Sequence, residues 1–240
     1  APIVTDLAPA PPGVSTRPGA PSADGGRERV SSRSREKSTS GGRADDKGSV
    51  KNAGAAENTA EAQYSKGDFA RAIELLEDAA ATNSGATAQR LREKADRYEK
   101  VQAQLQNGDS LTGSAPAQAL AAYMDAQRTD RRVGGRLAKT LERKIAAVAP
   151  GAAEAHFGAR RYPEARVAVD LATRLGKGSD SRLGRVRTGL EDAARATFVD
   201  GQTAQRAGDL AKARTLWIRV QKMVPDDNAY YKKANDALSK

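Results

Sequence analysis

The fold is decided by the segment GDLAKARTLWIRVQKMVP, residues 208–225. Its Gly-Asp pair is typical of a tight turn, and Ala213, Trp217 and Val220 follow at offsets of four and three residues. Side chains with this spacing lie on one face of an α-helix, and Pro225 marks a position beyond the end of that helix. The segment therefore predicts a turn followed by a helix that buries one stripe of side chains.

The same pattern occurs four times along the chain. Its first small residue is Ala72, Ala119, Ala165 and Ala213 in the successive copies, at intervals of 47, 46 and 48 residues. In each copy a bulky side chain follows four residues later, and a small or apolar side chain follows three residues after that. Spacing this regular predicts an array of repeated helical hairpins.

The composition favours an all-α fold. Only 4% of the 240 residues are aromatic and 38% are apolar, and most of the apolar residues are alanine, which favours helices over sheets. Without cysteine the chain has no disulfides or thiolate metal sites, and no apolar run reaches the length of about 20 residues that a membrane span needs. The chain begins at Ala1 without a leader sequence. We therefore expect a fragment or processed product, from either the cytoplasm or the cell envelope.

Two regions with different compositions divide the chain. Residues 1–56 are rich in Pro, Ala, Gly, Ser and Arg and have few apolar side chains to bury, which predicts a disordered linker. Residues 57–240 carry the repeats, and their last helix is expected to be a polar cap that begins at Asp226-Asp227. The helices expected from periodicity and from turn residues are 53–66, 69–82, 88–106, 117–128, a segment from 134 that Pro150-Gly151 breaks or kinks, 163–175, 181–207 and a closing helix to Leu238.

The four copies resemble divergent tetratricopeptide repeats (TPR), from about residue 57 to Pro225. The family's second helix combines a Gly-Asp-aromatic turn with small, bulky and small residues at these offsets and a closing proline. The period of 46–48 residues is longer than the usual 34. Other departures are Ser84, Ser114 and Arg131, and Arg160-Arg161 in place of Gly-Asp. The resemblance implies a short right-handed α-solenoid whose concave face binds a partner protein or peptide.

In the family, three positions of each first helix face the concave surface. The resemblance therefore implies partner-binding roles for Glu57, Glu61 and Tyr64 in the first copy, Glu154 and Phe157 in the third, and Phe198, Gln202 and Gln205 in the fourth. Packing between helices is the alternative role for Phe157 and Phe198. For Trp217 the alternatives are a core position and an exposed recognition anchor.

Basic residues gather in the later copies. Residues 101–240 hold 24 Lys or Arg side chains against 15 Asp or Glu, out of a net charge of +10 for the whole chain. The alternatives for this surface are a solvated face, a site for an acidic protein, and a site for nucleic acid or anionic lipid. Because the aromatic residues are few and not interleaved with the arginines, nucleic acid is disfavoured. The predicted basic patch consists of Arg128, Arg131, Arg132, Arg160, Arg161 and Arg166.

No arrangement of residues in the sequence points to catalysis. His156 is the only histidine, and the sequence shows no phosphate-binding loop and no metal-ligand cluster, so we expect no cofactor. The leading hypothesis is a non-enzymatic scaffold or adaptor. The alternative is electrostatic binding of nucleic acid or an anionic membrane surface, and self-association also stays open.

Overall fold

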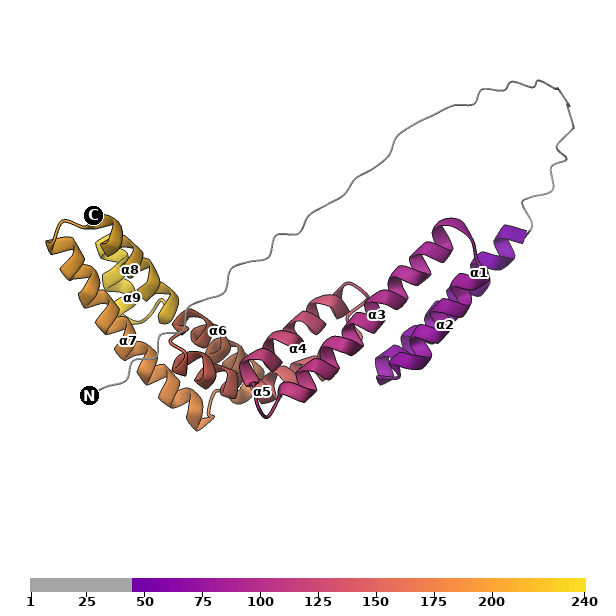
Figure 1. Ribbon diagram of the computed structural model, residues 1–240, viewed down its shortest axis with the longest axis horizontal. Coiled ribbons are helices and arrows are strands. Elements are labelled where there is room, and N and C mark those ends of the chain that lie inside the picture. Colours follow the sequence, from indigo (N-terminus) through magenta and orange to yellow (C-terminus); the bar gives the residue numbers. More distant parts are fainter. Residues whose placement is uncertain (1–44) are drawn as a thin grey trace, which may run out of the picture. The chain divides into compact units, whose positions relative to one another are not determined.

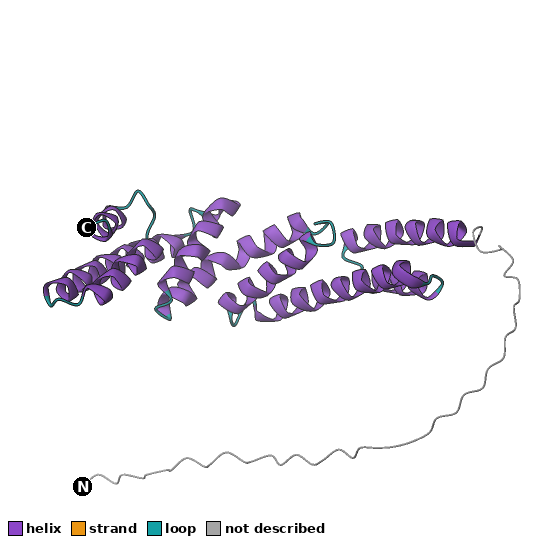
Figure 2. Cartoon of the chain, turned by 90° about the horizontal axis from the view of Figure 1, so that it is seen from above, coloured by secondary structure: helices purple, strands orange, loops and turns teal. Residues whose placement is uncertain are grey.

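Helices make up almost all of the chain that the structure describes. The computed structural model describes the backbone of residues 45–240 and the side chains from Asn52 onward, all within one unit, Gly42–Lys240. Most of the predicted linker, residues 1–44, lies outside the described residues. Figure 2 shows helices joined by short loops, and residues 45–240 contain no β-strand. This confirms the all-α prediction.

The helices pack in the order in which they occur along the chain, and each one contacts the next (Figure 1). The α1/α2, α3/α4, α5/α6 and α7/α8 pairs are the four predicted hairpins. The helices are α1 (Asp45–Lys66), α2 (Phe69–Ala81), α3 (Gly85–Leu111), α4 (Pro116–Arg131), α5 (Ala138–Gly158), α6 (Tyr162–Ala172), the π-helical turn η1 (Thr173–Lys177), α7 (Ser181–Arg206), α8 (Leu210–Met223) and α9 (Ala229–Leu238).

The four alanines of the repeat occupy equivalent places. Each is the fourth residue of a second helix, α2, α4, α6 or α8, and none exposes any surface to solvent. The bulky residue one turn later is buried in every copy as well: Leu76, Tyr123, Val169 and Trp217. The repeated hairpin that the sequence predicts is therefore present four times.

Two turns have the conformation that the Gly-Asp pairs predict. Gly67 and Gly208 have φ angles of 86° and 82°, and Asp68 and Asp209 cap the following helices by accepting a backbone N–H bond. In the third copy Arg160 takes the place of the glycine. It has a φ of 58°, a left-handed conformation that is unfavourable for a side chain with a Cβ.

Several predicted boundaries were wrong, and three of them have a structural reason. The first helix begins at Asp45 rather than near Ala53, which places residues 45–56 of the predicted linker inside α1. Ala53 is buried, and a helix anchored at that point extends readily toward its N-terminus. The third helix continues to Leu111 instead of ending at Gln106, because the Tyr123 hydroxyl donates a hydrogen bond of 2.6 Å to Asp109. The closing helix is capped by Asn228 rather than by Asp226-Asp227.

Pro150 does not break its helix. α5 is continuous from Ala138 to Gly158 with Pro150 inside it, although proline removes one helical hydrogen bond and commonly costs about 3 kcal/mol. The proline ring is buried, as are Ala149, Ala152 and Ala153 around it. Burial of this segment in the core offsets the lost hydrogen bond.

The buried apolar residues form two clusters. The larger extends from α1 to the first half of α7, and the smaller joins the second half of α7 to α8 and α9. Tyr162, at the start of α6, packs against both clusters. Among first helices, α1 contacts α3 and α5 contacts α7, but the described backbones of α3 and α5 do not come into contact. A regular right-handed solenoid therefore remains a prediction.

Candidate partner-binding surface

Ion pairs connect the first helices of the first two hairpins. Lys94 of α3 lies 2.7 Å from Glu57 and 2.6 Å from Glu61, both on α1. Arg90 also pairs with Glu57, and Arg136 pairs with Glu61, each at 2.9 Å. The hydrogen bond from Lys94, assisted by Arg136, lowers the pKa of Glu61 below its usual value. The two glutamates predicted to bind a partner are therefore already engaged within the molecule.

The next two junctions between first helices are also bridged by ion pairs. Lys144 of α5 pairs with Asp109 of α3, and Arg185 of α7 pairs with Glu154 of α5 at 3.0 Å. Burial raises the pKa of Asp109, but the hydrogen bonds from Lys144 and Tyr123 outweigh burial and leave that pKa lowered. Glu154, a third predicted binding residue, is thus also paired within the chain.

Tyr64 belongs to a buried polar cluster and cannot face a partner. Its ring is fully buried and stacks on Tyr98 with 3.9 Å between ring centroids. Its hydroxyl donates to Asp130 at 2.9 Å, and the backbone N–H of Leu137 donates to the same carboxylate. Burial, with the nearby Asp130 carboxylate, raises the pKa of Tyr64. The predicted binding role of Tyr64 is therefore wrong, and the residue joins α1 to the α4–α5 turn.

Phe157 packs between helices, which is the alternative role that the sequence left open for it. It is half-buried, with its ring centroid 5.6 Å from that of Tyr162 and its ring against Gly189 of α7, where a Cβ would overlap it. A glycine at residue 189 therefore lets α7 approach α5 closely.

The three residues predicted for the fourth copy lie together. Phe198, Gln202 and Gln205 line a groove of about 600 Å³ that involves α7, α8 and α9. From α7 the lining also takes Arg195 and Val199, and α8 contributes Trp217. From α9 and the residues after it come Tyr230, Lys233, Asp236, Ala237 and Lys240. We call this site the α7–α9 groove.

The α7–α9 groove combines an apolar lining with basic side chains. Phe198 and Trp217 are buried, whereas Val199 is 51% exposed and available for contact. Phe198 packs against Tyr230 with 6.3 Å between ring centroids, and the Lys233 ammonium lies 5.0 Å from the centroid of the Tyr230 ring. The Trp217 indole N–H has no acceptor among the described residues. A segment carrying both an apolar and an acidic side chain would match this lining.

Sequence reasoning missed the residues that α9 contributes. That helix was expected only to close the array, yet its residues Tyr230, Lys233 and Ala237, with Lys240 just beyond its end, form one side of the groove. Their offsets of three, four and three residues were a signal, because they describe one stripe of a helix. Trp217 is a core residue, 2% exposed, that also lines the groove.

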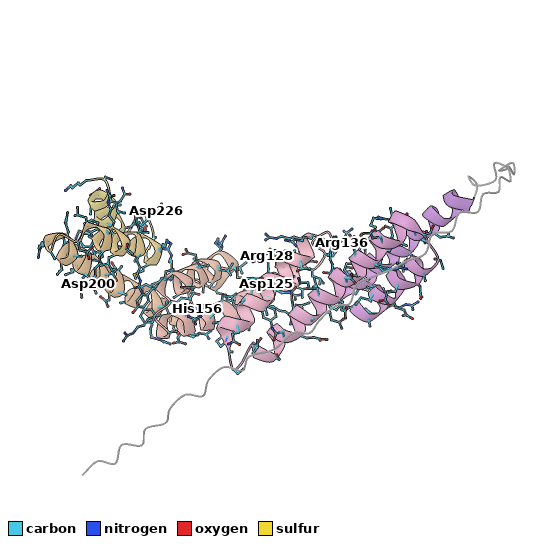
Figure 3. All side chains as sticks on the ribbon, turned by 45° about the horizontal axis from the view of Figure 1, so that its top comes forward. Asp125, Arg128, Arg136, His156, Asp200 and Asp226 are labelled. Atoms are coloured by element: carbon cyan, nitrogen blue, oxygen red, sulfur yellow. The ribbon has the colours of Figure 1, made fainter. Side chains whose placement is uncertain are left out.

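The predicted basic patch is not one surface. Arg128, Arg131 and Arg132 lie where α4 ends and the chain turns into α5, while Arg160 and Arg161 follow the other end of α5. The 21 residues of α5 separate the two groups by about 30 Å. Figure 3 labels Arg136, which precedes α5, and His156, in the last turn of α5, well apart along the molecule. Arg128 and Arg166 also pair with Asp125 and Asp170 on their own helices.

Neither a metal site nor a membrane span is found among the described residues. They contain no cluster of three His or acidic side chains that could hold a metal ion, and none of their helices meets the length and hydrophobicity needed to cross a bilayer. His156, in the last turn of α5, has a pKa lowered by burial, which the nearby Glu164 carboxylate partly opposes. No nucleophile is hydrogen-bonded to it among these residues.

Comparisons of the chain with models of protein families, with curated proteins and with solved structures found no match. The functional assignment consequently depends on the geometry of the grooves and helices described above.

Proposed function

We propose that this chain is a non-enzymatic binding protein, a scaffold or adaptor that holds a segment of a partner protein in the α7–α9 groove. One observation carries the proposal. Successive first helices are linked by ion pairs at three junctions, α1–α3, α3–α5 and α5–α7. Among the described residues no ion pair links α7 to α9, and this junction contains a groove of about 600 Å³, against hollows of about 350 Å³ beside the α3–α5 pair and 370 Å³ beside the α5–α7 pair.

The lining of the groove defines the chemistry of the partner. Arg195, Lys233 and Lys240 outnumber the single acid, Asp236, so the lining favours a negatively charged segment. Val199 and Ala237 provide apolar contact beside the aromatic rings, and a groove of this volume is within the range of ligand sites in proteins. The Gln202 and Gln205 amides can donate to and accept from a peptide backbone. The partner we propose is therefore an acidic segment with at least one bulky apolar side chain.

The proposal includes a TPR-like architecture. Its support is the four hairpins with equivalent buried alanines, together with small buried residues in three of the first helices: Ala60, Ala153 and Gly201. In a stack of such hairpins the first helices line one shared face. The α7–α9 groove would lie on that face, between a first helix and the helix that follows the hairpin.

The test compares two valines of similar exposure on different helices. Val199 lies in the groove and is 51% exposed, and Val167 lies on α6 and is 56% exposed. Tagged full-length protein with Val199→Asp, Lys233→Glu or Val167→Asp would be used to recover partners from extract of the source cells. We expect the two groove variants to lose a specific protein that the wild type and Val167→Asp retain.

The partner identified in this way would then be purified and titrated against the protein. Trp217 is the only tryptophan in the chain and lines the groove, so its fluorescence reports occupancy directly when the partner segment lacks tryptophan. We expect the groove variants to weaken binding by about tenfold or more, as centrally placed contacts do. Equal loss in Val167→Asp, or unchanged binding by Val199→Asp and Lys233→Glu, would contradict the proposal.

A further inference from the structure

α8 differs from the other second helices in the charge of its side chains. It carries Lys212, Arg214, Arg219 and Lys222 and no acidic residue. α2 has one basic and three acidic residues, and α4 and α6 each mix both signs. The acidic residues nearest to α8 in sequence lie at its ends, Asp209 as the N-cap and Asp226-Asp227 beyond the C-terminus. Only this second helix therefore has side chains of a single charge.

The four cations of α8 are exposed and are not neutralised by the protein. None of them forms an ion pair with a described residue, whereas Arg71, Arg128 and Arg166 on the other second helices each pair with an acid. Arg219 lies over the ring of Tyr162, 5.8 Å from its centroid, which leaves its charge uncompensated. Unpaired charges of one sign attract a surface of the opposite sign.

Aliphatic side chains accompany these cations. Leu210 is 60% exposed and Ile218 is 44% exposed, and Ile218 lies between Arg214 and Lys222 at four-residue spacing on one face of the helix. None of the large apolar residues that stand out as exposed in the described part of the chain is aromatic. Protein surfaces that bind single-stranded nucleic acid typically present aromatic rings on which the bases stack. Cations accompanied by aliphatic side chains instead suit the headgroup region of a bilayer.

We propose that the outward face of α8, defined by Leu210, Lys212, Arg214, Ile218, Arg219 and Lys222, binds the surface of an anionic membrane. This site is separate from the α7–α9 groove, whose only residue from α8 is the buried Trp217. Each Lys or Arg at an anionic lipid surface strengthens binding about fivefold, and the effect decays over the Debye length. Binding by the four cations is consequently reversible and sensitive to salt.

The test is cosedimentation of the full-length protein with vesicles. One set contains equal parts of phosphatidylglycerol and phosphatidylcholine, and the other contains phosphatidylcholine alone. We expect binding to the anionic vesicles at low salt, loss of that binding at high salt, and none to the neutral vesicles. Replacing both Arg214 and Lys222 with Gln should weaken binding about 25-fold.

A charge-matched variant provides the control. Lys139 and Arg143 are exposed cations of α5 with no acidic partner among the described residues. Replacing both with Gln removes the same charge from another helix and should change vesicle binding much less. If the two double variants weaken binding equally, the overall charge of the chain is responsible and the site on α8 is wrong.

A second pair of measurements separates a membrane from other polyanions. Replacing both Leu210 and Ile218 with Ser should weaken vesicle binding several-fold while leaving weak binding to heparin, a soluble polyanion, unchanged. Failure of the wild type to bind anionic vesicles at low salt would overturn the proposal. Tighter binding to single-stranded RNA than to the vesicles, lost with the Arg214 and Lys222 substitutions, would assign α8 to nucleic acid instead.

Discussion

At the scale of single residues, glycine positions decide how closely paired helices can pack. Gly108 contacts the ring of Tyr123 in the second hairpin, and Gly201 contacts the indole of Trp217 in the fourth. A Cβ at either position would overlap the neighbouring ring. The buried ring is in both cases the bulky residue one turn after the repeat alanine, so the glycine and the ring form one packing unit.

Gly201→Ala is expected to destabilise the fold. The added Cβ would overlap the Trp217 indole, and overpacking of this kind usually costs about 1–3 kcal/mol in the free energy of unfolding. Gly184 lies in the same helix with no atom within 4 Å of its Cβ position. Gly184→Ala should therefore stabilise by up to about 1 kcal/mol through helix propensity. Urea unfolding followed by Trp217 fluorescence measures both, and a stabilising Gly201→Ala would contradict the packing described here.

Two stacked tyrosines allow a second comparison at this scale. Tyr64→Phe removes the hydrogen bond that the Tyr64 hydroxyl donates to the buried Asp130 carboxylate. Loss of a donor to a buried carboxylate lowers the free energy of unfolding by about 1–3 kcal/mol. The buried Tyr98 hydroxyl has no hydrogen-bond partner among the described residues. Tyr98→Phe should therefore be neutral or slightly stabilising. Unfolding followed by circular dichroism tests the pair, and equal losses in the two variants would contradict a stabilising role for the Asp130 hydrogen bond.

At the scale of helices and turns, the sequence is most informative where local chemistry decides the structure. The turns at Gly67-Asp68 and Gly208-Asp209 were predictable because glycine adopts a positive φ and aspartate caps a helix. Sequence alone did not predict that α3 continues to Leu111 or that α5 passes through Pro150 without a break. Both depend on contacts with residues distant in sequence, which local propensity does not contain.

The third turn yields a prediction because it lacks the glycine of the other copies. Arg160 has a φ of 58°, and replacing it with glycine should raise the free energy of unfolding by up to about 1 kcal/mol by relieving the strained backbone. Its neighbour Arg161 has a φ of −87°, which any residue adopts. Arg161→Gly should consequently destabilise by about 0.5–1 kcal/mol through backbone entropy. If both variants shift stability in the same direction, strain at Arg160 is not the cause.

At the scale of the whole described molecule, the candidate site was only partly predictable. Family resemblance indicated Phe198, Gln202 and Gln205, and these do lie together in the α7–α9 groove. The same rule did not anticipate that Glu57, Glu61 and Glu154 each pair with a basic residue on another first helix. Their binding roles stay predictions. Such pairing depends on which helices become neighbours, and a sequence pattern within one helix does not specify that.

The stability of the molecule should fall in two separate steps as the pH is lowered. His156 is the only histidine, and burial lowers its pKa below the unfolded value of 6.5. The unfolded chain therefore binds more protons in that interval, so stability decreases as the pH falls from about 6.5 through the folded pKa. Glu61, Asp109 and Asp180 also have lowered pKa values, about 2 for Asp180. Their contribution is present above their unfolded pKa values of 4.5 for Glu and 3.8 for Asp, and it is lost only below them.

His156→Gln separates the two steps. Urea midpoints measured between about pH 7 and pH 5 should decrease for the wild type and stay level for His156→Gln, since histidine is the only side chain that ordinarily titrates there. Below about pH 4.5 both proteins should lose stability together, because Lys94 and Lys144 then lose their carboxylate partners. The assignment to His156 would be wrong if the variant showed the same decrease as the wild type between pH 7 and pH 5. Such a result would place the proton uptake on another group whose pKa is lower in the folded state than in the unfolded chain.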